Sequence, residues 1–81
     1  MSQEESLPEL SPAMLSQARV IAKGTRIREV QRLVDGYGGR ASKWVKKSSP
    51  KFEINGEPAE YHWYQHPGLP RVEVTLVKQA R

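Results

Sequence analysis

Apolar and polar residues recur with two different periods along this chain, one in each half. Between residues 12 and 36 the apolar positions are three or four residues apart, as in amphipathic helices. Ser11 and Pro12 cap a predicted helix over residues 12–22, and Thr25 caps a second one that ends at Gly36. The apolar sides consist of Met14, Leu15, Ala18, Ile21 and Ala22 in the first helix and of Ile27, Val30, Leu33 and Val34 in the second. Each predicted helix therefore needs a partner that covers one side of it.

After residue 39 the period falls to two, which predicts strands. The lysine-rich segment 41–47 suits an edge strand or a loop. Asn55-Gly56 predicts a tight hairpin whose return strand begins near Ala59, because Pro58 cannot donate a backbone hydrogen bond. A turn at 67–70 then precedes a last strand over 71–77. Helices followed by strands indicate an α+β fold, with two N-terminal helices packed on a three- or four-stranded antiparallel meander.

The turn at 67–70 also predicts a register for the last hairpin. It places His66 opposite Arg71 and Tyr61 opposite Leu76. One face then carries the apolar residues Tyr61, Trp63, Val72, Val74 and Leu76, which we expect to face the helices. The other face carries His62, Tyr64, His66, Arg71, Glu73 and Thr75, and we expect it to be the functional surface. Trp44 fits either the core or a stacking platform.

The charge of the chain is unevenly distributed. Residues 1–10 contain three Glu and no base, which gives −3, whereas residues 11–81 contain 13 basic and 6 acidic side chains, which gives +7. We interpret 1–10 as an acidic disordered lead and 11–81 as one domain. Ten Lys or Arg between positions 19 and 51 face only two acidic residues, and this field favours a polyanion such as nucleic acid. An anionic membrane or an acidic protein would satisfy the same charge.

Composition limits the chemistry further. The chain has no cysteine, which excludes disulfides and thiolate metal sites, and its two histidines make a weak case for zinc. We therefore expect no cofactor. No apolar run approaches the roughly 20 residues that span a bilayer, so we expect no membrane segment.

The residue types on the predicted polar face match what RNA cleavage without metal requires. The 2′-hydroxyl of the substrate is the nucleophile, so the protein supplies a base, an acid and cations. His62 serves as acid or base, Glu73 as a base if its pKa is raised, and Arg71 binds the phosphate. Tyr64 stacks on a base or donates a proton; Arg71 and Glu73 also fit an ordinary surface ion pair. The predicted nucleic-acid contacts are Arg40, Lys43, Lys46, Lys47, Ser48 and His66, the last of which also suits a purely structural role at the turn.

The chain also resembles a known family. The residues concerned are the run from Val30 to Lys47, the strand Tyr61-His62-Trp63-Tyr64, the turn at Pro67-Gly68 and the segment Arg71-Val72-Glu73. They resemble the C-terminal toxin domains of bacterial polymorphic toxins, of the Rhs-repeat and contact-dependent inhibition type, which are grouped with barnase, colicin ribonucleases and RelE toxins.

This resemblance implies a metal-independent ribonuclease that acts in the bacterial cytoplasm, delivered by a secreted carrier or encoded as a toxin–antitoxin pair, and neutralised by an acidic immunity protein or antitoxin. His62 and Arg71 fall on motif residues, and Lys46 and Lys47 fall in the basic strand. The start at Met1 with an acidic lead departs from the family pattern. It is also compatible with a descendant of the family that has lost catalysis. Two alternatives remain: a non-catalytic nucleic-acid-binding module, and a protein-interaction domain with a basic surface.

Overall fold

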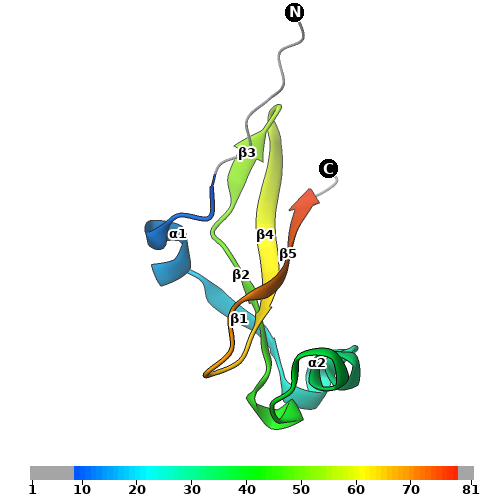
Figure 1. Ribbon diagram of the computed structural model, residues 1–81. Coiled ribbons are helices and arrows are strands. Elements are labelled where there is room, and N and C mark those ends of the chain that lie inside the picture. Colours follow the sequence, from blue (N-terminus) through cyan, green and yellow to red (C-terminus); the bar gives the residue numbers. More distant parts are fainter. Residues whose placement is uncertain (1–8, 79–81) are drawn as a thin grey trace, which may run out of the picture.

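The computed structural model describes residues 9–78, and within them the main element is an antiparallel sheet of five strands (Figure 1). The elements in chain order are α1 (Pro12–Ser16), β1 (Arg19–Lys23), a 3-10 turn (Gly24–Arg26), α2 (Val30–Tyr37), a second 3-10 turn (Ala41–Lys43), β2 (Val45–Ser48), β3 (Phe52–Ile54), β4 (Glu57–Gln65) and β5 (Val72–Lys78). The predicted α+β class is confirmed. Neither of these two helices is long and apolar enough to cross a membrane, a finding that covers residues 9–78.

The long strand β4 organises the sheet. His62 pairs with Ser48 of β2 and with Thr75 of β5, and Ala59 pairs with Phe52 of β3 and with Lys78 of β5. β2 and β3 therefore lie end to end along one edge of β4, and β5 lies along the other edge. β1 pairs with the outer edge of β2. Because β2 pairs with β4 and not with the next strand β3, the sheet is not the simple meander that we expected.

The first predicted helix is largely wrong. Its start is confirmed, since the Ser11 hydroxyl accepts from the Met14 backbone N–H at 3.2 Å, but α1 ends at Ser16. The segment that follows contains two consecutive β-branched residues, Val20 and Ile21, and forms β1. Pairing with β1 makes the lysine-rich β2 an internal strand instead of the predicted edge strand or loop.

The second predicted helix is confirmed in part as α2. It begins at Val30, because Thr25 lies in a 3-10 turn, and it ends at Tyr37 and not at Gly36. Val30 and Leu33 of α2 are buried, and with Ile27, which precedes α2, they form a core around the fully buried Trp44. Tyr64 and Val72 of the sheet pack against this cluster, so α2 covers the face of the sheet that carries Tyr64. Figure 1 shows α1 on the left beside the middle of the sheet and α2 at the lower right, so the two helices form no common layer.

A second buried group lies on the opposite face. Tyr61 and Trp63 are buried there as predicted, whereas Val74 is 46% exposed and is not the core residue that we expected. α2 does not cover this apolar face, because it packs on the opposite one. The expectation that one face would be apolar and packed and the other polar and open is thus wrong, because α2 packs on part of the polar face.

The β3–β4 hairpin agrees with its predicted turn, whereas the β4–β5 hairpin departs from its predicted register. Asn55 and Gly56 both have positive φ, 53° and 77°, as a tight two-residue hairpin turn requires, although β4 begins two residues before Ala59. In the last hairpin Tyr61 pairs with Leu76 as predicted, but a bulge then shifts the pairing by one residue. The bulge contains Glu73, whose φ of 54° is unusual for a residue with a side chain.

Candidate active site

A hollow of about 310 Å³ lies on the face of the sheet that carries His62, beside α2. Strand alternation places His62 and Tyr64 on this face, and their pairing partners Ser48 and Lys46 share it. The residues that line the hollow are Glu29, Arg32, Lys46, His62, Trp63, Tyr64, Glu73 and Thr75. A base, cations and hydroxyl groups therefore converge in one place.

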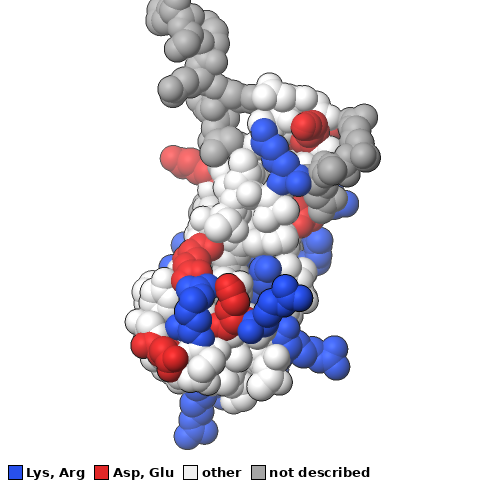
Figure 2. All heavy atoms as spheres, turned by 90° about the vertical axis from the view of Figure 1, so that its right-hand side faces the viewer, with Lys and Arg blue, Asp and Glu red and all other residues white. Residues whose placement is uncertain are grey.

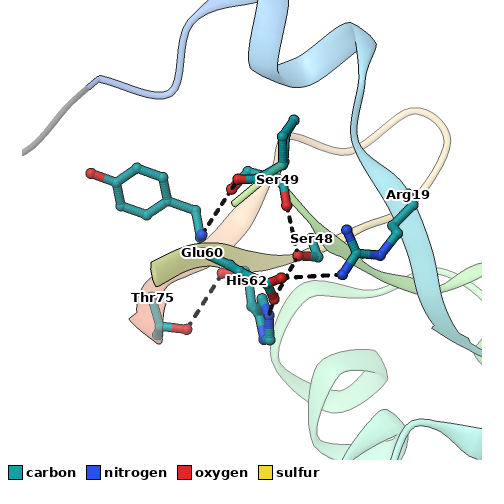
Figure 3. Close-up of polar contacts among 8 residues, drawn as sticks. Arg19, Ser48, Ser49, Glu60, His62 and Thr75 are labelled. Atoms are coloured by element: carbon teal, nitrogen blue, oxygen red, sulfur yellow. Dashed lines mark hydrogen bonds and ion pairs between the residues drawn. The ribbon is translucent and has the colours of Figure 1, made fainter. Parts of the chain in front are cut away.

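The strongest feature of the site is a buried carboxylate bound to His62 (Figure 3). Glu60 is 3% exposed, and its Oε1 lies 2.8 Å from His62 Nε2. The Ser48 hydroxyl lies 3.0 Å from the same oxygen, and the Arg19 guanidinium donates to Oε2 at 3.1 Å. The hydrogen bond from His62 lowers the pKa of Glu60, against its burial, and Ser48 and Arg19 lower that pKa further.

The ionised carboxylate determines which nitrogen of His62 carries a proton. Because Glu60 can only accept, Nε2–H of His62 donates to it, and Nδ1 remains as the nitrogen that exchanges a proton with a ligand. The His62 side chain is 16% exposed, so it borders the hollow while being held in place. Glu60 and His62 form a pair suited to general acid–base chemistry.

Sequence reasoning missed Glu60. The signal was present, because Glu60 and His62 are two residues apart on a strand and so share a face. Ser48 was predicted as a nucleic-acid contact, but it is fully buried and supports Glu60 instead.

A second cluster borders the hollow at the bulge. Arg32 holds the carboxylate of Glu73 with two hydrogen bonds of 2.7 and 2.8 Å, and the Tyr37 hydroxyl donates to Glu73 at 2.9 Å. The contact with Arg32 lowers the pKa of Glu73, whereas the predicted role as a base required a raised pKa. Arg32 was not among the predicted site residues, and it is the guanidinium that the hollow contains.

Lys46 and Tyr64 lie side by side in the hollow. Lys46 Nζ is 5.8 Å from the centroid of the Tyr64 ring. Burial raises the pKa of Tyr64, so its hydroxyl stays protonated at neutral pH. Of the predicted lysines, Lys46 lies on the same face of the sheet as His62. Tyr64 presents a hydroxyl group and an aromatic ring to a ligand in the hollow.

Three other predicted contacts, Lys43, Lys47 and His66, border a different hollow of about 480 Å³. Lys47 pairs with Trp63 and lies on the opposite face of the sheet from Lys46. His66 Nε2 accepts from the Arg40 backbone N–H at 3.1 Å, and its Nδ1 lies 2.6 Å from the Pro67 carbonyl oxygen, to which it donates. His66 therefore holds two loops together, which is the structural role considered above.

The remaining predicted residues lie outside the hollow around His62. Arg71 is exposed in the loop before β5, and Arg40 is exposed after α2. The hollow thus brings together the predicted residues His62, Tyr64, Glu73 and Lys46. Arg32, Thr75 and Glu60 complete the cluster.

The surface around α2 is mixed in charge. Figure 2, which views the molecule from the side on which α2 lies, shows acidic and basic side chains next to one another over its lower part. Among residues 9–78 no three His, Asp or Glu side chains gather into a group that could hold a metal ion. Any polyanion bound here meets separate cations and not a continuous basic patch.

Compared with known protein families, curated proteins and solved structures, the chain matches none of them.

Proposed function

We propose that this domain cleaves RNA at the hollow around His62, with the 2′-hydroxyl of the substrate as the nucleophile. The observation that carries the proposal is a histidine held by a buried carboxylate in a hollow that also contains Lys46 and Arg32. The resemblance to polymorphic toxin domains supports the same chemistry. It adds the expectation of a bacterial cytoplasmic RNA target and an acidic immunity protein or antitoxin.

Each group has a defined task in this reaction. His62 Nδ1 takes the proton of the 2′-hydroxyl, whose oxygen attacks the adjacent phosphorus and displaces the 5′-oxygen of the next nucleotide. Glu60 stabilises the resulting imidazolium through Nε2–H. Lys46 and Arg32 stabilise the added negative charge on the phosphorus oxygens. Lys46 and the protonated Tyr64 are the donors within the hollow for the leaving 5′-oxygen.

The test uses purified protein and a short RNA in the presence of EDTA. We expect two fragments, one of which ends in a 2′,3′-cyclic phosphate, and no cleavage where the scissile ribose is replaced by deoxyribose. His62→Ala should lower the rate by about 10²- to 10⁴-fold, the usual contribution of a positioned acid or base. Lys43→Gln, on the other side of the sheet, is the matched control and should cleave normally.

Circular dichroism and the unfolding midpoint establish that His62→Ala is folded. Cleavage that needs Mg²⁺, that proceeds on the deoxy substrate or that survives His62→Ala in a folded protein would contradict the proposal.

A second candidate function is RNA binding without cleavage. It is favoured by the state of Arg32, which is already bound to Glu73 and lies 3.3 Å from Glu29. A phosphate must compete with two carboxylates for this cation. Salt-sensitive binding of intact RNA in EDTA, with no fragments after long incubation, would select this function over the nuclease.

A further inference from the structure

The hollow around His62 continues into a neighbouring one that none of the chemistry above uses. The second hollow, of about 370 Å³, shares Glu29, Lys46 and Tyr64 with the first. It extends away from His62 towards Arg26 and Arg28, which precede α2. The two hollows therefore form one groove, with proton-transfer groups at one end and two guanidinium groups at the other.

The far end of the groove has the chemistry of a phosphate-binding subsite. Arg26 and Arg28 are exposed there, and the ion pairs within residues 9–78 join neither of them to a carboxylate. Ala22 and Ile27 add an apolar floor. Among residues 9–78, Glu29 is the one acidic residue that borders this hollow; it lies at the junction and interacts with Arg32 of the first hollow.

We propose that this second hollow binds a phosphate adjacent to the one placed at His62, on a single-stranded polynucleotide. This inference rests on the proposed function, because it extends the same groove. A guanidinium group binds a phosphate through two hydrogen bonds to its oxygens. An apolar floor with a tyrosine at its edge accepts the exposed ring of an unstacked base. Single strands expose such bases, whereas helical RNA keeps its bases paired and stacked.

The test measures binding separately from cleavage. Oligodeoxynucleotides of two, three and four nucleotides lack the 2′-hydroxyl, so their dissociation constants can be determined at several salt concentrations without turnover. We expect Kd to fall about tenfold between the dinucleotide and the longer strands, the size given by two exposed ion pairs. The double variant Arg26→Gln/Arg28→Gln should lose this gain and keep the dinucleotide Kd.

Salt dependence gives a second readout on the same samples. Loss of the contact with this one phosphate should reduce the slope of log Kd against log salt by about 0.7 for the longest strand. The matched control is Lys43→Gln/Lys47→Gln, which also removes two positive charges, but from the hollow on the opposite face. The control should keep both the length-dependent gain and most of the slope.

The inference is overturned if the affinity of the wild-type protein does not increase with strand length, or if the arginine variant keeps this increase. It is also overturned if the lysine control loses as much of the increase as the arginine variant does. Cleavage of an RNA dinucleotide in EDTA is measured in parallel and reports on the nuclease proposal alone. A length gain that depends on the arginines, without dinucleotide cleavage, supports the subsite and rejects the nuclease. Dinucleotide cleavage without a length gain rejects the subsite and supports the nuclease.

Discussion

The two histidines of this chain lie four residues apart and have opposite surroundings. His62 is inside β4, and its Nε2 binds the buried carboxylate of Glu60. His66 follows the end of β4, and its two ring nitrogens bind the backbone of Arg40 and Pro67. Strand alternation predicts both on one face, but it stops applying once the strand ends at Gln65.

The difference decides which histidine is suited to proton transfer. A carboxylate partner stabilises both the neutral ring and the imidazolium, so His62 can gain a proton without losing its hydrogen bond. His66 has one donor and one acceptor as neighbours, which fixes a single neutral tautomer with the proton on Nδ1. The comparison therefore assigns chemistry to His62 and loop geometry to His66.

The largest effect should come from removing the carboxylate that distinguishes His62. Glu60→Ala leaves His62 and the Arg19 guanidinium without the carboxylate that accepts from them, whereas the buried Ser48 hydroxyl keeps the Ser49 carbonyl oxygen as acceptor. We expect a loss of about 2–3 kcal/mol in the free energy of unfolding. Urea denaturation measures this loss.

Glu60→Gln separates structure from chemistry. The amide keeps an oxygen that accepts a hydrogen bond, so stability should fall by only about 1 kcal/mol. It cannot stabilise the imidazolium, so the cleavage rate should still fall by about tenfold or more. A Gln variant with the wild-type rate would leave Glu60 with a structural role only.

The contacts of His66 can be disrupted by a substitution at Gly39. Its φ is +80°, and a methyl group there would collide with His66 Nε2. Gly39→Ala should therefore lower the free energy of unfolding by about 2 kcal/mol. In a His66→Ala background the same substitution should cost less, because only the backbone strain remains.

The matched control is Gly36→Ala. Gly36 lies within α2, and a methyl group there meets no atom within 4 Å. Alanine should raise stability by about 0.5–1 kcal/mol. Equal costs at the two glycines would contradict the role assigned to His66. The cleavage rate of correctly folded Gly39→Ala should remain close to that of the wild type.

Acid unfolding sharpens the comparison further. The pKa of Glu60 is lowered from its ordinary value of 4.5, mainly by the hydrogen bond from His62. The folded state therefore binds fewer protons than the unfolded state, and the stabilisation is present above about pH 4.5 and lost as pH falls through the folded pKa. Unfolding free energies measured between pH 6 and pH 2 should fall less steeply in Glu60→Gln than in the wild type.

The smallest effect is expected at Glu73, whose ion pair with Arg32 is partly exposed. Such pairs contribute up to about 1 kcal/mol, so Glu73→Gln should change stability by less than that. It should also release Arg32 and tighten dinucleotide binding. Glu73→Gly should be at least as stable as Glu73→Gln, because glycine adopts the φ of 54° without strain. Weaker dinucleotide binding in both variants would show that Glu73 itself contributes to the site.

Sequence patterns predicted the features that depend on neighbouring residues. The Asn55-Gly56 turn and the apolar side of α2 are local, and both are confirmed. β1 was mistaken for helix because its partner is distant: Arg19 pairs with Ser48, and no pattern within 12–22 encodes this. The bulge at Glu73 was equally hidden, because a one-residue slip depends on packing across the sheet.

The site followed the same division. His62 and Tyr64 could be placed together by alternation along one strand. The same alternation places Glu60 beside His62, but it does not predict the burial and low pKa of Glu60, which depend also on Arg19 of β1 and Ser48 of β2. The lysines were divided between two faces by strand pairing, which is why Lys46 borders the site and Lys47 does not.

The placement of β1 has a consequence for local opening of the fold. β1 is paired on one side only, its residues are almost all exposed, and its pairing with β2 closes a loop that contains all of α2. Strands with few buried contacts open at lower free energy than the rest of a domain. Amide hydrogens of β1 should therefore exchange with solvent faster than those of β4. Each such opening also removes Arg19 from Glu60, so an exposed edge strand helps to set how long the carboxylate beside His62 keeps all of its hydrogen bonds.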